Sequence, residues 1–112
     1  MAELLIIARL PETPGQAQDA FAHHYRHEAE RTMRTADLTL VLPSADHTHH
    51  AWRSAAIQTL ARQAAPFRVN MIAGDDRVAI AKTCDYLATA KGVTGQYLVT
   101  DGPGVDFAVA RD

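Results

Sequence analysis

Histidines are the side chains of this sequence whose spacing points most directly to chemistry. They fall into two clusters, His23, His24 and His27, and His47, His49 and His50. His23 and His27 are one helical turn apart, and two such imidazoles can chelate zinc, which binds neutral nitrogen at tetrahedral angles. The alternative is that both clusters face solvent or a partner. The sequence favours this alternative, since it shows no third ligand and no supporting shell.

A second candidate for chemistry is His50, with Ser44 and Arg53 nearby in the sequence. An imidazole titrates near neutral pH, which suits a general acid or base. Proton transfer alone needs a reacting partner such as a hydride donor, and the sequence shows no site for one. Trp52, next to His50, is more typical of packing or of an interface anchor than of a ligand platform.

The overall composition excludes several classes of protein. The 112 residues include 11 Lys and Arg and 13 Asp and Glu, scattered without a block of like charge. This balance argues against a nucleic-acid partner. The apolar run at residues 4–8 is too short for a signal sequence or a membrane span, and the single Cys84 is best explained by packing. We therefore expect one cytoplasmic domain, residues 1–112, that binds neither nucleic acid nor membrane.

Apolar runs and helical periodicity alternate along the chain. Strands are expected at residues 4–8, 38–42, 67–72 and 96–100, and a short extended segment at 105–109. Helices are expected at 14–35 and 46–64, and a third helix opens at 73–76 and is ended by Gly92 in a left-handed cap. The order β-α-β-α-β-α-β predicts an α/β fold with an open, parallel, four-stranded sheet and three helices.

Periodic apolar positions indicate which helix faces are buried. The first helix has a stripe at every fourth residue, Ala17, Phe21, Tyr25, Ala29 and Met33. The second carries Trp52, Ala56, Ile57, Leu60, Ala61 and Ala64, and Pro66 is expected to stop it. In the third helix the expected inward positions are Ile80, Cys84 and Leu87.

Four motifs from Thr39 onward make the chain resemble the C-terminal half of the short-chain dehydrogenase/reductase (SDR) family. They are TLVLPS at 39–44, Ala55-Ala56 before Leu60-Ala61-Arg62, RVNMIAG at 68–74, and Tyr86-Leu87-Ala88 followed by VTGQ at 93–96 and Asp101-Gly102. Residues 3–36 are similar to the preceding strand and helix of that fold. The resemblance implies half of a Rossmann-like sheet, that is, a truncated and degenerate family member.

The resemblance also shows which functional positions have changed. The family holds its cofactor on a glycine-rich turn after the first strand, and this sequence has no G-x-x-x-G-x-G. The family's catalytic tyrosine and the lysine four residues later correspond to His50 and Ser54, while Ser44 matches the family's serine. Asn70 and Gly74 are at positions that could be remnants of a cofactor-side loop. The lid that the family inserts after Gly74 has no counterpart.

The family motifs that this chain retains are those that the family uses for packing and subunit contact. In the family, the helices that correspond to 14–35 and 46–64 form a bundle with a second subunit, and we expect Phe21, Tyr25 and Trp52 at that interface. The strand at 4–8 would leave an exposed edge that a partner should cover. The leading hypothesis is a non-catalytic assembly or regulatory subunit without cofactor, in a homo-oligomer or with a full-length SDR-type dehydrogenase. The alternatives are an oxidoreductase subunit whose NAD(P) site a partner completes, and a His-cluster metal protein.

Overall fold

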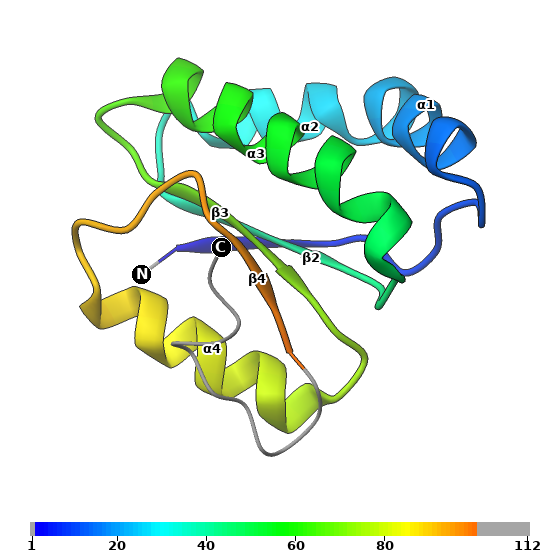
Figure 1. Ribbon diagram of the computed structural model, residues 1–112. Helices are drawn as coiled ribbons and strands as arrows, with labels where there is room; N and C mark the ends of the chain where they lie inside the picture. Colours follow the sequence, from blue (N-terminus) through cyan, green and yellow to red (C-terminus); the bar gives the residue numbers. More distant parts are fainter. Residues whose placement is uncertain (1, 101–112) are drawn as a thin grey trace.

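The computed structural model describes residues 2–100 and contains one parallel sheet (Figure 1). Its strands lie in the order β1-β2-β3-β4, and every neighbouring pair is parallel. Their bounds are β1 Glu3–Ile6, β2 Leu38–Leu42, β3 Val69–Ala73 and β4 Tyr97–Val99. The predicted α/β class and the four-stranded parallel sheet are confirmed. The extended segment expected at 105–109 lies outside the described residues.

The helices form a layer on each face of the sheet (Figure 1). Helices α1 (Pro14–His24), α2 (Arg26–Thr32) and α3 (His50–Ala64) cover one face, and α4 (Arg77–Thr89) covers the other. Each connection steps one strand further in the same direction. The crossover through α4 must therefore have the opposite hand to the other two, and right-handed crossovers are nearly universal. The crossover through α4 is therefore the unusual one, and it places α4 over the second face of the sheet.

Buried side chains account for this arrangement. Every residue of β2 and β3 is buried, as expected for strands with helices on both faces. The larger core cluster lies between the sheet and α1, α2 and α3 and includes Phe21, Leu40 and Met71. A smaller cluster, with Ile72 and Leu98 at its centre, lies under α4.

The first predicted helix is divided in two at Tyr25, which has φ −125° and ψ −27°. The hydrogen bonds from Tyr25 N to Phe21 O and from Ala29 N to Tyr25 O are both kept. The apolar stripe therefore stays in phase, and Ala29 and Met33 are buried as expected. Periodicity cannot detect a break that leaves the phase of the stripe unchanged. The prediction of three helices is corrected to four on this account.

The start of the next helix also differs from the prediction. A single turn of 3-10 helix, His47–His49, precedes α3, and Asp46 caps it by accepting a hydrogen bond from Thr48 N at 2.9 Å. The hydrogen bonds from Thr48 lower the pKa of the Asp46 carboxyl below its ordinary value. The predicted end at Ala64, ahead of Pro66, is confirmed.

The inward positions expected for α4 are confirmed in part. Leu87 is buried, and Ile80 and Cys84 pack half-buried against the smaller cluster, while the buried Ala79 and Thr83 were not predicted. The predicted left-handed cap at Gly92 is wrong, because α4 is capped by Ala90, and the positive φ in the following loop, 73°, is that of Gly95. A Cβ on Gly95 would lie 3.2 Å from Ala61 Cβ, so the close passage of this loop against α3 determines where glycine is needed.

β1 is an edge strand, as the sequence predicted. Leu4 and Ile6 belong to the apolar run that predicts this strand, yet they are 54% and 65% exposed. Their side chains lie on the face that α4 covers, beyond the reach of that helix. No described helix is long and apolar enough to cross a membrane.

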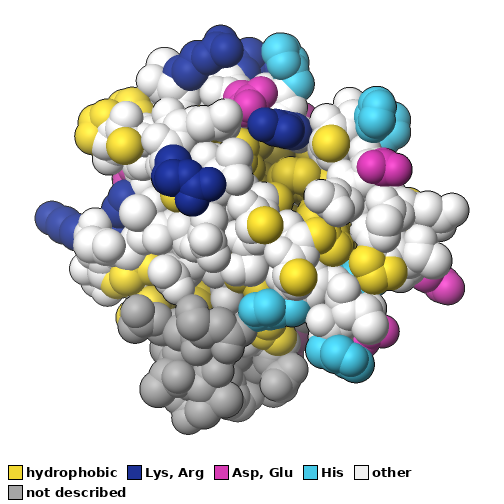
Figure 2. Space-filling view, turned by 45° about the horizontal axis from the view of Figure 1, so that its top comes forward, with side chains coloured by type: hydrophobic (Ala, Val, Ile, Leu, Met, Phe, Trp, Pro, Cys, Tyr) yellow, Lys and Arg dark blue, Asp and Glu magenta, His cyan; other side chains and the backbone are white. Residues whose placement is uncertain are grey.

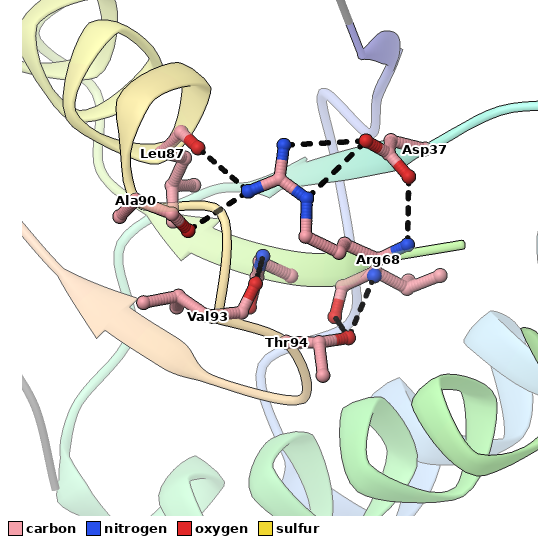
Figure 3. Close-up of polar contacts among 8 residues, drawn as sticks. Asp37, Arg68, Leu87, Ala90, Val93 and Thr94 are labelled. Carbon is pink, nitrogen blue, oxygen red and sulfur yellow. Dashed lines mark hydrogen bonds and ion pairs between the residues drawn. The ribbon is translucent and has the colours of Figure 1, made fainter. Parts of the chain in front are cut away.

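Arg68 ties three elements together at the amino end of the sheet (Figure 3). Its guanidinium donates to Asp37 Oδ2 at 3.2 Å and 3.3 Å, and to the carbonyl oxygens of Leu87 and Ala90 at 3.0 Å and 2.8 Å. The backbone N–H of Arg68 donates to Asp37 Oδ1 at 2.8 Å. One side chain thus joins the start of β2, the start of β3 and the C-terminal end of α4.

Replacing Arg68 should therefore destabilise the fold. Arg68→Met leaves the Asp37 carboxylate and two helix-end carbonyls without this donor, and we expect the free energy of unfolding to fall by about 2 kcal/mol in urea denaturation. Arg68→Lys should recover little, because an ammonium cannot reproduce the planar fork. Arg62→Met, which removes only a hydrogen bond to Thr59, is the matched control. Equal stability of the Arg68 and Arg62 variants would contradict this role.

Candidate functional site

The candidate site lies at the carboxyl ends of β2 and β3, beside the start of α3. Parallel sheets bind their ligands at this end. Ser44, which follows β2, is exposed, and its backbone N–H donates to Asp75 Oδ1 at 3.2 Å. Asp75 follows Gly74 at the end of β3. The two loops that would frame a ligand are therefore linked to each other.

His50 and Ser54 lie one turn apart on α3, as their spacing predicted. The ring of His50 is 5.3 Å from the ring of Tyr97 between centroids, tilted by 59°. Ser54 Oγ accepts a hydrogen bond from Gln58 Nε2 at 3.0 Å and lines a groove of about 310 Å³ between α3 and the loop before β4. An imidazole can exchange a proton near neutral pH, but a serine hydroxyl carries no charge to lower a neighbour's pKa.

Sequence reasoning underestimated Arg53, which lies between these two residues. Its side chain is only 1% exposed. Nη1 donates to Pro43 O at 2.8 Å and to Tyr97 Oη at 3.2 Å, and the guanidinium carbon lies 5.6 Å and 6.0 Å from the ring centroids of Trp52 and Tyr97. Arg53 shares the spacing of the buried residues Ile57, Leu60 and Ala64. That spacing is the signal that could have identified it as inward.

The environment of Arg53 is unusual for a charged group. Its Nε is buried without a hydrogen-bond partner, and no described carboxylate pairs with the guanidinium. A buried charge is costly unless it is paired. Two aromatic faces and the two hydrogen bonds that Nη1 donates offset part of this cost. The group holds the end of β2 against β4, and a guanidinium cannot act as an acid or base near neutral pH.

Asn70 and Gly74 both have structural explanations. Asn70 Nδ2 donates to Val93 O at 3.0 Å, and its Oδ1 accepts from Gln96 N at 3.0 Å, so its amide holds the loop between α4 and β4. A Cβ on Gly74 would lie 1.9 Å from Thr100 Oγ1, which itself donates to Ala73 O at 2.9 Å. The position next to the strand end is thus filled by Thr100.

The expected interface residues belong largely to the chain's own core. Phe21 and Trp52 are 3% and 7% exposed, with ring centroids 5.7 Å apart, and Tyr25 is half-buried. Trp52 Nε1 donates to His49 Nδ1 at 3.1 Å, and His49 Nε2 lies 2.8 Å from Glu12 O. A carbonyl can only accept, so His49 is held as the Nε2–H tautomer.

A shallow groove of about 190 Å³ separates α1 from α3 above this core. Small side chains, Ala22, Ala55 and Ala56, form part of its lining. Figure 2 looks onto the helical layer and shows hydrophobic atoms gathered in a hollow, with Lys or Arg, acidic and His side chains around them. An interface here stays a prediction.

The histidine clusters were the basis of the metal hypothesis. His23 Nδ1 lies 2.8 Å from Asp19 O, and His27 is exposed. Within residues 2–100 no three His, Cys, Asp or Glu side chains are grouped so as to hold an ion. The pair His23 and His27 is therefore left without a third ligand from the described part of the chain.

A larger apolar groove, of about 640 Å³, lies on the opposite face between α4 and the strands β1 and β2. Leu4 and Ile6 line it from β1, and Ile80 and Cys84 from α4. Burial and the neighbouring Asp85 carboxylate raise the pKa of the Cys84 thiol. This groove was not anticipated, because its two walls are far apart in the sequence.

The packing of Arg53 leads to a stability prediction. Arg53→Met should change the free energy of unfolding by no more than about 1 kcal/mol, because removing a buried charge with no ion-pair partner among the described residues offsets the loss of the hydrogen bonds to Pro43 O and Tyr97 Oη. Arg53→Ala should cost about 2–4 kcal/mol through the cavity that it leaves. Urea denaturation measures both. If Arg53→Met is as damaging as Arg53→Ala, the hydrogen bonds to Pro43 O and Tyr97 Oη outweigh the cost of the buried charge.

The raised pKa of Cys84 predicts slow alkylation. The thiolate is the reactive form, so near neutral pH iodoacetamide should modify Cys84 more slowly than a cysteine in a short peptide, and the rate should keep rising above the ordinary pKa of 9.0. Asp85→Asn removes the like charge and should speed the reaction, whereas Asp19→Asn, remote from the groove, should not. A rate for Cys84 equal to that of the free peptide would contradict this prediction.

Comparison with known proteins agrees with the fold. A family model described as "Short chain dehydrogenase-like protein" matches residues 5–100. Neither a curated protein nor a solved structure matches significantly. The match spans all four strands and all four helices except the first residues of β1. The chain therefore belongs to the short-chain dehydrogenase-like (SDR-like) family.

Proposed function

We propose that this SDR-like chain is a non-catalytic assembly or regulatory subunit that acts in an oligomer in the cytoplasm. The observation that carries the proposal is the chemistry at the start of α3. His50 and Ser54 replace the tyrosine and lysine that the family resemblance implies, and between them Arg53 is turned into the core. Ser54 brings no cation in place of the lysine, and the guanidinium of Arg53 donates to Pro43 O and Tyr97 Oη instead.

The family motifs that the chain keeps support the same proposal, because their side chains act in packing. Arg68 joins β2, β3 and α4, and Asn70 holds the loop before β4. Gly74 makes room for Thr100. The motif residues at both ends of β3 are thus used to join elements of the fold, which favours a scaffold over a ligand site.

A second candidate function is an oxidoreductase subunit whose NAD(P) site is completed by a partner chain. The observation that favours it is the exposed Ser44 at the carboxyl end of β2, the position of the family's serine. In this case the partner would be a full-length SDR-type dehydrogenase that brings the cofactor turn.

Nucleotide titration of the purified chain tests the leading proposal. We expect no saturable binding of NADH or NADPH by calorimetry up to millimolar concentrations, because the sequence has no glycine-rich phosphate turn. A complete SDR enzyme, titrated in parallel, is the positive control. Micromolar binding by this chain alone would overturn the non-catalytic proposal.

Mixing with a partner dehydrogenase separates the two candidates. A stabilising subunit should change the partner's melting temperature and leave kcat unchanged, whereas a subunit that completes the active site should change kcat. Ser44→Ala is the diagnostic variant, since a loss of kcat on this change alone would favour the shared site.

A further inference from the structure

β1 presents a row of backbone groups that no described strand pairs with. Glu3 N and Ile7 N donate to Asp37 O and Val41 O of the neighbouring segment at 2.9 Å and 2.8 Å. Successive residues of a strand direct their N–H and C=O groups to opposite sides. The backbone groups of Leu4 and Ile6 therefore point away from β2, to the open edge of the sheet.

Side chains along the same edge carry a symmetrical pattern. Ile6, 65% exposed, is the most exposed large apolar side chain described. Glu3 and Arg9 lie three residues to either side of it, and both are exposed. β1 ends at Ile6, and Ile7 N still donates to Val41 O; if the same alternation continues to Arg9, Glu3 and Arg9 share the face of Leu5 and Ile7. Neither has an ion-pair partner within the described part of the chain.

We propose that a second copy of this chain pairs with the first through β1, antiparallel, with the twofold axis at Ile6. In this register Ile6 faces Ile6 of the second copy, and each exchanges its N–H and C=O with the other. Leu4 pairs in the same way with Ala8 of the second copy. Leu4, Ile6 and Ala8 alternate with the residues that pair with β2. Their N–H and C=O groups therefore point to the second copy and meet its outward-pointing groups.

Charge complementarity selects this register. With Ile6 on the axis, Glu3 lies opposite Arg9 of the second copy, and Arg9 lies opposite Glu3 of the second copy. These are non-hydrogen-bonded pairs, in which cross-strand side chains come closest. A register centred on Leu5 also satisfies the outward groups, but it places Glu3 opposite the buried Ile7 and leaves both charges unpaired.

The pairing joins two four-stranded sheets into one and is isologous, because each copy offers the same strand. The two Ile6 side chains cover each other on the α4 face. The groove beside α4 stays open on each copy, because the second copy adds a strand at the edge and no helix over the face. The inference deepens the proposed oligomer and rests on it, but it uses a surface different from the groove between α1 and α3.

A charge swap at the ends of β1 tests the proposal. Sedimentation velocity over a concentration series should show the wild-type chain as a dimer that dissociates on dilution. Glu3→Arg places Arg opposite Arg at both ends of the pair and should raise the dissociation constant by about tenfold or more. The double variant Glu3→Arg with Arg9→Glu reverses both charges and should restore dimerisation.

Control variants separate this surface from others. Glu28→Arg makes the same charge change on α2 and should leave the dimer intact, and Ala55→Arg alters only the groove between α1 and α3. Circular dichroism confirms that each variant is folded. If Ala55→Arg weakens the dimer and Glu3→Arg does not, the β1 pairing is overturned but the proposed oligomer is kept. If the wild-type chain is a monomer, both are overturned.

Cys84 supplies an independent readout. Its alkylation rate should be the same in monomer and dimer, because edge pairing leaves the groove beside α4 open. Protection of Cys84 on assembly would show that the second copy or another segment occupies the groove and would overturn the proposed geometry. Failure of the double charge swap to restore the dimer would overturn the register.

Discussion

Burial of the two central strands on both faces is the constraint on which the rest of this structure depends. β2 and β3 have no exposed residue, so the sheet needs a helical layer above and below it. Helices α1, α2 and α3 provide one layer with right-handed connections, and α4 provides the other only by reversing the hand. One helix cannot span four strands, and the uncovered part of the second face falls on β1.

Several features that look unrelated follow from this incomplete cover. Leu4 and Ile6 are exposed although they belong to an apolar run, and a groove of about 640 Å³ lies between them and α4. Cys84 lies in the same groove, which is why its pKa is raised without full burial. Arg68 lines the same groove and donates to the last carbonyls of α4, so the single helix of this layer is held by a side chain as well as by packing.

The proposal of a scaffold without the family's reaction depends on the carboxyl end of the sheet. A ligand site there needs space and polar groups that converge on it. In this chain the space beside Gly74 is taken by Thr100, and Arg53 points inward to join Pro43 to Tyr97. Fold membership therefore describes the packing of this chain, while function has to be argued from its individual side chains.

The sequence by itself determined the α/β class and the four strands, because apolar runs and helical stripes are local patterns of burial. The edge position of β1 was expected from the resemblance to half of a sheet. The sequence also placed His50 and Ser54 on one side of a helix, since residues four apart share a face. Only the tertiary structure decided the break at Tyr25, the glycine at 95 and the inward turn of Arg53. Each of these depends on contacts between segments far apart in the chain, such as Gly95 with Ala61 and Arg53 with Tyr97, and local periodicity carries no information about them.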